Sequence, residues 1–230
     1  MVDDPKQIWR LFVKFISKDY VDSLVEEGLL YMNNVEYFRK IENKDSALRG
    51  DKYEGNAFTY ESSKIELTYA GIELKTVGKI DITYGHELET NLYCLTAIND
   101  YDIIKAGYDL KLSDKFKQFG DKAVLIPGSE IREFCNRVKK TAEKDKNIRS
   151  HPVCEYITSP VEYVDRDKHH GPVGIYRKFK EYSWQYEWRI AIKQNFQKGA
   201  YEHFKIGSIK DICIVTDTEE LINNLKCEKK

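Results

Sequence analysis

The amino-acid sequence predicts an α+β fold in which strands outnumber helices. Short apolar or alternating segments recur along the chain, and only a few segments have the spacing of an amphipathic helix. No internal repeat and no Pro-, Gly- or Ser-rich linker divides the 230 residues. Because an ordinary domain has about 150 residues, we expect residues 1–230 to form one domain with insertions.

The N-terminal part predicts a strand, a short helix and a second strand. Residues 8–16 (IWRLFVKFI) mix β-branched and aromatic side chains with basic ones, as strands do. Ser17 to Asp19 can cap a helix that ends at Gly28, and LLYM at 29–32 follows as a short strand. The polar stretch 33–56, which contains YFRK and RGDKYEG, is expected to be either a binding loop or a solvated connection.

The remaining elements follow from patterning in the same way. Residues 57–84 alternate strand-like pieces and predict an antiparallel meander. The nearly uncharged run 91–98 (NLYCLTAI) predicts a central strand that is buried on both faces. Further elements are expected at 122–127 (strand), after Ser129 (helix), and at 159–164 (strand), 176–182 (helix), 188–196 (strand), 209–216 (strand) and 218–226 (helix).

Composition excludes several function classes. The 37 Lys and Arg residues nearly balance the 38 Asp and Glu residues, so a whole-surface attraction to nucleic acid or to anionic membrane is excluded. Five cysteines without a CxxC pair indicate reduced thiols in a cytosol. No run approaches 18 apolar residues, and the N-terminus has no signal-like core. We therefore expect a soluble, cytoplasmic protein with no membrane partner.

The familiar catalytic motifs are absent from the sequence. It contains no GxGxxG, GxxxxGK[ST], HExxH or GxSxG, which speaks against Rossmann, P-loop, zincin and serine-hydrolase chemistry. Five scattered histidines do not form a metal triad, so no metal site is predicted.

The most informative segment is 178–190 (KFKEYSWQYEWRI). Gln185 and Glu187 lie two residues apart, among Trp184, Tyr186 and Trp188. If the segment is extended, its period of two places both polar groups on the same side. The two groups would then point into a cleft rimmed by aromatic rings. A rigid, partly desolvated carboxylate in such a cleft can stabilise a positive charge that develops in front of it.

The order of these features resembles the ADP-ribosyltransferase superfamily, in the branch whose catalytic triad is Arg, Ser and Glu. The segments that carry the resemblance are LFVKFIS, GLLYMNN, RGDKYEG, LYCLTA and WQYEWRI, between about residues 10 and 192. The sequence is also similar to an uncharacterised bacterial family of domains of unknown function, related to toxin and phage-defence ADP-ribosyltransferases. The resemblance implies split antiparallel β-sheets packed with a few helices, and NAD as a substrate without a metal.

Within this resemblance, the catalytic glutamate corresponds to Glu187 and the residue that orients the acceptor to Gln185. The Ser/Thr position corresponds to Thr96, which keeps a hydroxyl although the usual Ser-Thr-Ser run is missing. The first-strand basic residue, which would hold the pyrophosphate, is Arg10 or Lys14. These two lie four residues apart on the same face of a strand, so the sequence does not choose between them.

The chemistry implied is cleavage of the bond between nicotinamide and ribose, which gives the ribose oxocarbenium character. Nicotinamide leaves as a neutral group, so no strong general acid is needed. Glu187 would bind the ribose 2′-hydroxyl and favour the cation, and Gln185 would position the nucleophile. Tyr93, Tyr53 and Trp184 are candidate rings for stacking on nicotinamide, or else members of the core.

The acceptor implied by the toxin-like relatives is a nucleic acid, RNA or DNA, with protein as the alternative and an antitoxin as a possible partner. The expected helix 132–149 has a local excess of positive charge and could bind phosphates, although a solvated helix face is the alternative. The cations proposed for this contact are Arg132, Arg137, Lys139 and Lys140.

Two readings from other function classes stay open. One is a metal-dependent nuclease of a defence system, which would use Asp51 and Glu54 together with other carboxylates. The other is a binding module without catalysis, in which the RGDKYEG loop and the aromatic surface recognise a partner.

Overall fold

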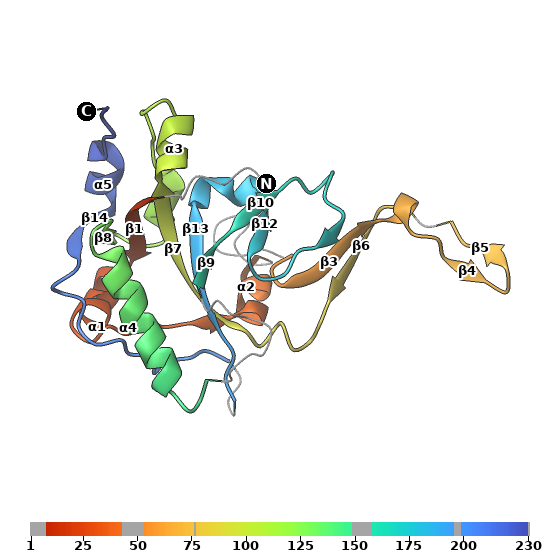
Figure 1. Cartoon of the computed structure of the whole chain (residues 1–230), viewed down its shortest axis with the longest axis horizontal. Helices are drawn as coiled ribbons and strands as arrows, with labels where there is room; N and C mark the ends of the chain where they lie inside the picture. The colour runs from red at the N-terminus through yellow and green to blue at the C-terminus, as the bar shows by residue number, and fades with distance from the viewer. Residues whose placement is uncertain (1–7, 43–52, 76, 149–157, 196–198, 230) are drawn as a thin grey trace.

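The computed structural model of the chain is a mixed α+β fold built around one antiparallel sheet (Figure 1). The structure describes residues 8–42, 53–75, 77–148, 158–195 and 199–229. In the central sheet the strand order is β14-β8-β1-β7-β13-β9, and β2 pairs with the start of β7. These strands are β14 (Ile214–Asp217), β8 (Lys122–Pro127), β1 (Trp9–Ile16), β7 (Asn91–Asn99), β13 (Glu187–Ile192), β9 (Thr158–Pro160) and β2 (Asn33–Asn34).

Strand β7 is the centre of the sheet. It lies between β1 and β13, and of its nine residues all except Cys94 are buried. Its sequence has no charged side chain to solvate, so both of its faces can be covered. The prediction of a central, doubly buried strand at 91–98 is confirmed.

Helices α4 (Ile131–Lys144) and α1 (Val21–Val25) cover one face of this sheet. The buried side chains of α4 recur at helical spacing and share one apolar core with Phe12 of β1 and with Trp188 and Ile190 of β13. In Figure 1, α4 crosses in front of the sheet. Strand residues that alternate with Phe12 and Trp188 therefore point to the opposite face.

The opposite face has its own apolar core. Phe15 of β1 stacks on Phe116 at a centroid distance of 4.3 Å, and Leu221 of α5 belongs to the same core. The helical elements near this face are α3 (Asp100–Lys105), α5 (Thr218–Asn224) and the 3₁₀ turn Asp114–Gln118. Among the described residues, no helix has the length and apolar character that crossing a membrane requires.

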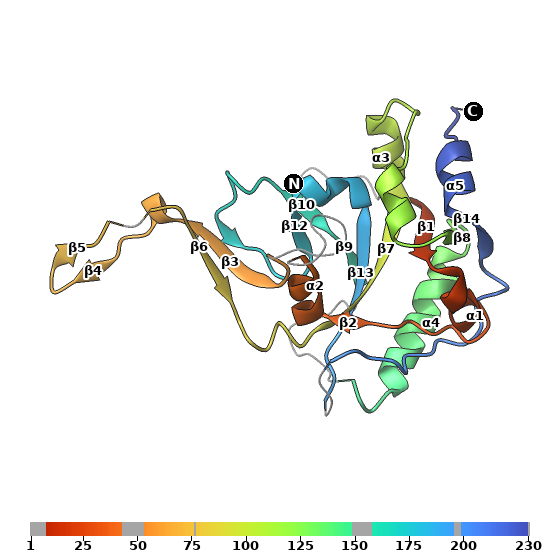
Figure 2. The same cartoon turned by 180° about the vertical axis from the view of Figure 1, so that it is seen from behind.

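Smaller sheets and one helix form a second layer beside the central sheet (Figure 2). Strand β3 pairs with β6 and β11, β10 pairs with β12 in parallel, and β4 and β5 form a separate hairpin that projects from the body. These elements are α2 (Val35–Glu42), β3 (Asn56–Glu61), β4 (Thr68–Tyr69), β5 (Ile72–Glu73), β6 (Lys79–Thr83), β10 (Glu162–Val164), β11 (Gly171–Pro172) and β12 (Arg177–Phe179).

Strands β1 and β7 pair over only part of their length. Their ladder ends at the pair Val13–Thr96, whereas β1 continues along β8 to Ile16. Strand β2 pairs along the same edge of β7 at Asn91 and Leu92. The intervening stretch of β7, Tyr93 to Leu95, faces a cavity.

Several sequence predictions are wrong in detail. Residues 176–182 do not form a helix, because 177–179 pair with β10 and 180–185 form a 3₁₀ turn, so strand pairing overrides a weak helical preference. The polar stretch 33–56 contains α2, whose first turn is capped by a hydrogen bond from Tyr37 N to Asn34 Oδ1 of 2.9 Å. Helix α4 has Glu130 and not Ser129 at its N-cap.

Candidate active site

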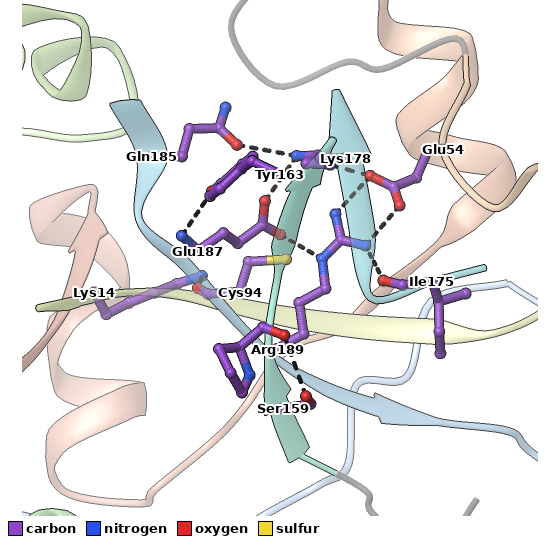
Figure 3. A network of polar contacts seen from close by, with 11 residues as sticks. Lys14, Glu54, Cys94, Ser159, Tyr163, Ile175, Lys178, Gln185, Glu187 and Arg189 are labelled. Carbon is purple, nitrogen blue, oxygen red and sulfur yellow. Dashed lines mark hydrogen bonds and ion pairs between the residues drawn. The ribbon is translucent and has the colours of Figure 1, made fainter. Parts of the chain in front are cut away.

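The structure brings together side chains from β12, from β13 and from the residues just before β3 into one buried polar cluster (Figure 3). We use the name charged cluster for Glu54, Lys178, Glu187 and Arg189. Glu187 and Arg189 project from β13, Lys178 from β12, and Glu54 precedes β3. The RGDKYEG and WQYEWRI motifs thus meet in space through the ion pair between Glu54 and Arg189.

Glu187 is held by cations on both carboxylate oxygens. Its Oε1 accepts from Arg189 Nε at 2.6 Å, and its Oε2 accepts from Lys178 Nζ at 2.7 Å. The Cys94 thiol also hydrogen-bonds this carboxylate, and the backbone N–H of Glu187 donates to Tyr163 Oη at 2.8 Å. Burial by itself would raise the pKa of Glu187, but the charges of Arg189 and Lys178 outweigh burial and hold the pKa well below its ordinary value.

Arg189 is the most deeply buried charge of the cluster, with a side-chain exposure of 1%. Its two terminal nitrogens bind the two oxygens of Glu54, each at 2.7 Å, which is the bidentate geometry that a guanidinium favours. It also donates to the carbonyl of Ile175. Burial opposes the charge of Arg189, yet Glu187 and Glu54 raise its pKa well above the ordinary value.

Lys178 connects the two acidic residues with Gln185. In addition to its contact with Glu187, its Nζ donates to Gln185 Oε1 at 3.0 Å and lies 3.7 Å from Glu54 Oε2. One ammonium therefore sets the distance between the amide and the carboxylate of the Gln-x-Glu pair. Two carboxylates and two cations make the cluster neutral as a whole, which is the condition under which buried charges are tolerated.

Two unusual backbone positions shape the cluster. Tyr186 adopts φ 46° and ψ 48°, so Gln185 ends a 3₁₀ turn and Glu187 begins β13. The expectation that both belong to one extended segment is therefore wrong, and they converge through Lys178. Gly55 has φ 69°, and a Cβ there would lie 2.6 Å from Cγ1 of Val35, so glycine is needed for the turn from Glu54 into β3.

A cavity of about 740 Å³ adjoins the cluster at the place where the β1–β7 ladder ends. Lys14 crosses this opening, with Nζ 2.9 Å from the carbonyl oxygen of Cys94 and 4.1 Å from the centroid of the Tyr93 ring. The cavity extends from the cluster to residues near α1, among them Tyr20 and Tyr31. Five of the predicted site residues line it, namely Lys14, Tyr93, Thr96, Gln185 and Glu187.

Register explains why Thr96 and Glu187 meet. They are directly paired between β7 and β13, and Cys94 pairs with Arg189 two residues away. Directly paired residues share a face of the sheet, and this face is opposite to the one that carries α4.

Three predicted contacts with NAD lie outside the cavity lining. Arg10 forms a two-point pair with Asp100, with Nη2 to Oδ2 at 3.0 Å, and is more than half exposed. The Tyr53 ring lies against Phe179 and under the guanidinium of Arg166. Trp184 packs on Phe116 and Phe119 in the apolar core. Of the two first-strand cations, Lys14 is therefore the one in the cavity.

The basic residues of α4 lie apart from the charged cluster. Arg132, Lys139 and Lys140 are exposed, whereas Arg137 is bound to Glu133 and bidentately to Asp211. The hydrogen bonds that Arg137 donates to these two carboxylates raise its pKa, and the contribution of Asp211 is the larger. Helix α4 packs on the face opposite to Glu187 but on the same face as α1, next to which the cavity ends.

The residues of the nuclease reading have different surroundings. Glu54 is bound to Arg189, and Asp51 lies outside the described residues, as does Arg49 of the RGDKYEG motif. In the part of the chain that the structure describes, no three His, Cys, Asp or Glu side chains gather as a metal ion would require.

Sequence reasoning missed Lys178 and Arg189 as site residues. Arg189 could have been found, because it lies two residues after Glu187 on a strand and must share its face. Lys178 had no such signal, because it lies in a segment that was expected to be helical. Cys94 and Tyr163 reach the cluster only through strand pairing and packing.

Comparisons with known proteins add no further constraint. No family model, no curated protein and no solved structure matches this chain.

Proposed function

We propose that the chain is an NAD-dependent ADP-ribosyltransferase, a toxin or phage-defence effector that transfers ADP-ribose to nucleic acid and is restrained by an antitoxin protein. The observation that supports this proposal is the convergence of Glu187, Gln185, Thr96 and Lys14 on one cavity. These residues come from three strands and a turn, and they are the positions that the ADP-ribosyltransferase resemblance requires to meet. Their meeting was not implied by any one of the motifs alone.

The cavity has suitable dimensions and lining for a dinucleotide. Its volume lies within the range of about 300–1,000 Å³ that is typical of small-molecule sites. Lys14 offers an ammonium for the pyrophosphate, and Tyr93, Tyr20 and Tyr31 offer rings along the walls. Glu187 and Gln185 would face the nicotinamide ribose.

In the proposed reaction, the bond between ribose C1′ and the nicotinamide nitrogen breaks, and its electron pair leaves with nicotinamide. Glu187 accepts a hydrogen bond from the ribose 2′-hydroxyl and favours the positive charge on the ribose. A nitrogen or oxygen of the acceptor forms the new bond to C1′ and loses its proton to water. Glu187 is an unsuitable base for this proton because its pKa is held low.

Lys178, Arg189 and Glu54 are positioning residues in this proposal. They keep Glu187 ionised and fix its orientation through contacts of 2.6 and 2.7 Å. Arg189, Lys178 and the Cys94 thiol occupy three of the roughly four lone-pair sites of the carboxylate, so about one site remains to face the substrate. Because the cluster is neutral as a whole, we expect Glu187 to act through an oriented lone pair more than through net charge.

The nucleic-acid part of the proposal is supported by the exposed cations of α4, Arg132, Lys139 and Lys140. They share a face of the sheet with α1, next to which the cavity ends. A nucleic-acid acceptor would have to extend from α4 around to this end of the cavity. The modification of long RNA or DNA chains should therefore depend more on the cations of α4 than the modification of short ones does.

The test is to incubate the protein with labelled NAD together with total RNA, DNA and protein from a cell. Glu187→Gln keeps the size of the side chain but removes the carboxylate, and we expect it to lower the rate of NAD cleavage about 100-fold or more. Glu219→Gln is the matched control, because this exposed glutamate lies on α5 and does not line the cavity. It should leave the rate unchanged.

The outcomes separate the parts of the proposal. Label in RNA or DNA supports the transferase chemistry and the nucleic-acid acceptor. Label in the protein fraction alone keeps the chemistry and replaces the acceptor. If the wild-type protein neither consumes NAD nor labels any fraction, the transferase proposal is wrong.

A further inference from the structure

The β4–β5 hairpin is apolar on one face only. Strand register pairs Tyr69 with Ile72, and the hydrogen bond from Leu74 N to Leu67 O, at 2.7 Å, extends the pairing by one step. Side chains two apart on a strand share a face, so Leu67, Tyr69, Ile72 and Leu74 form a single patch, named here the hairpin patch. Thr68 and Glu73 point to the other face.

The hairpin patch is open to solvent. The exposed fractions are 48% for Leu67, 74% for Tyr69, 65% for Ile72 and 44% for Leu74. None of these residues belongs to either apolar core of the molecule. Both views show the hairpin projecting from the body (Figures 1 and 2), so no other described element covers the patch.

The hairpin has a defined shape. Its two turn residues, Ala70 and Gly71, have φ of 50° and 78°, the pair of positive values that characterises a type I′ turn. This turn matches the twist of the flanking strands. The patch is therefore presented as a preformed surface, although an isolated two-stranded hairpin is only marginally stable in water.

We propose that a second copy of this chain covers the hairpin patch, so that two hairpins pack face to face about a two-fold axis. An apolar patch of this kind lowers the free energy when it is removed from water. A contact about a two-fold axis uses the same patch on both copies, so each hairpin patch would pack against its own duplicate.

The charges of the hairpin favour a copy of itself as the partner. Residues 64–75 (KIELTYAGIELK) contain two lysines and two glutamates, so their net charge is zero. Two copies can therefore approach without net repulsion, whereas a patch recognising a charged partner would be expected to carry an opposite excess.

The area is also adequate for a weak dimer. One tyrosine and three aliphatic side chains at these exposures offer about 450 Å² per copy, so complete burial of both patches gives about 900 Å², which is the size of a weak, transient contact. The proposal is independent of NAD chemistry, because none of the hairpin residues lines the cavity.

The test is sedimentation velocity of the full chain between about 1 and 100 µM, the range in which a micromolar Kd is visible. We expect a dimer whose fraction rises with concentration. Tyr69→Ser combined with Ile72→Ser removes the centre of the patch and should raise the dimer Kd at least about 100-fold. Thr68→Ser combined with Glu73→Asp changes the polar face of the same hairpin, keeps its net charge of zero, and should leave the Kd unchanged.

Circular dichroism and thermal melting show whether each variant is folded, and we expect little change because the hairpin lies outside both cores. A wild-type chain that stays monomeric at every concentration overturns the proposal, whatever else binds the patch. So does a dimer that survives loss of the patch, or one that both double variants weaken equally. None of these results bears on NAD cleavage.

Discussion

The charged cluster and the hairpin patch depart from the usual partition of polar and apolar groups in opposite directions. The cluster places four ionised side chains inside the protein, each at most 7% exposed. The hairpin patch places four large apolar side chains at the surface. The cluster is complete, since every charge has partners of opposite sign within the chain. The patch has no cover from the described residues, and so indicates a contact outside the chain.

The difference shows that the contacts of the cluster are completed within the chain, whereas those of the hairpin patch are not. A neutral group of buried ions is weak evidence for stability, because an apolar replacement of the same shape is often as stable. In the proposed function, the cluster serves to orient Glu187 at the cavity. The hairpin patch, in contrast, contributes nothing to orientation inside the fold, and its value depends on a second molecule.

Arg189→Met is expected to have the largest effect on folding. It leaves Glu54 and Glu187 buried with Lys178 as the remaining cation, and breaking a buried pair in this way costs about 3–5 kcal/mol. The free energy of unfolding from urea denaturation measures this cost. Arg10→Met is the matched control, because the exposed Arg10–Asp100 pair has similar two-point geometry.

We expect no measurable change from Arg10→Met, since exposed pairs contribute little. Equal effects of the two variants would show that burial is not what distinguishes the cluster. The charged cluster would then be no different from an ion pair on the surface.

Elements that show a pattern over a few neighbouring residues could be predicted from the sequence. Strand β7 follows from an uncharged apolar run, and α4 from a stripe of apolar side chains at helical spacing. Gln185 and Glu187 stood out because aromatic residues surround them over a few positions. The sequence could not pair Glu54 with Arg189, which lie 135 residues apart and meet only after two sheets have packed.

Aromatic residues show the same limit. Tyr93, Tyr53 and Trp184 are equally plausible stacking rings from sequence, yet only Tyr93 lines the cavity. Tyr186, between Trp184 and Glu187, has a left-handed backbone conformation, so the alternation of a strand does not extend from Glu187 back to Trp184. No sequence rule predicts that conformation for a tyrosine. Alternation also could not show that the β1–β7 ladder stops at Val13, which is what places Lys14 in the opening.

Lys178→Met is expected to have an intermediate effect that depends on pH. The low pKa of Glu187 means that its ionised form stabilises the wild-type fold above about pH 4.5, and this contribution is lost as pH falls through the folded pKa. Without Lys178, burial pushes the pKa of Glu187 upward, so protonation becomes less costly at low pH. The loss of about 1–3 kcal/mol expected at pH 7 should therefore shrink towards pH 4.

Thermal melting of the wild type and of Lys178→Met between pH 7 and pH 4 measures this difference in stability, which we call the gap. Lys40→Met provides a control, because Lys40 contacts Glu36 at 2.7 Å on the surface of α2. A gap for Lys178→Met that stays constant with pH would mean that this lysine does not control the ionisation of Glu187.

Ala70→Gly in the hairpin turn should give the smallest effect and sharpens the other half of the comparison. Ala70 has φ 50°, a left-handed conformation that costs an alanine about 1–2 kcal/mol but that glycine adopts freely. Glycine also gives the unfolded chain more freedom, so the net gain is less than about 1 kcal/mol. If the hairpin patch binds a second copy, a better-formed hairpin should tighten the dimer up to about fivefold in sedimentation.

The melting of the body should not change, because Ala70 contacts neither core. A rise in melting temperature with no change in dimer affinity would assign the hairpin to the stability of the monomer instead, and the two regions would then differ only in polarity and not in what they serve.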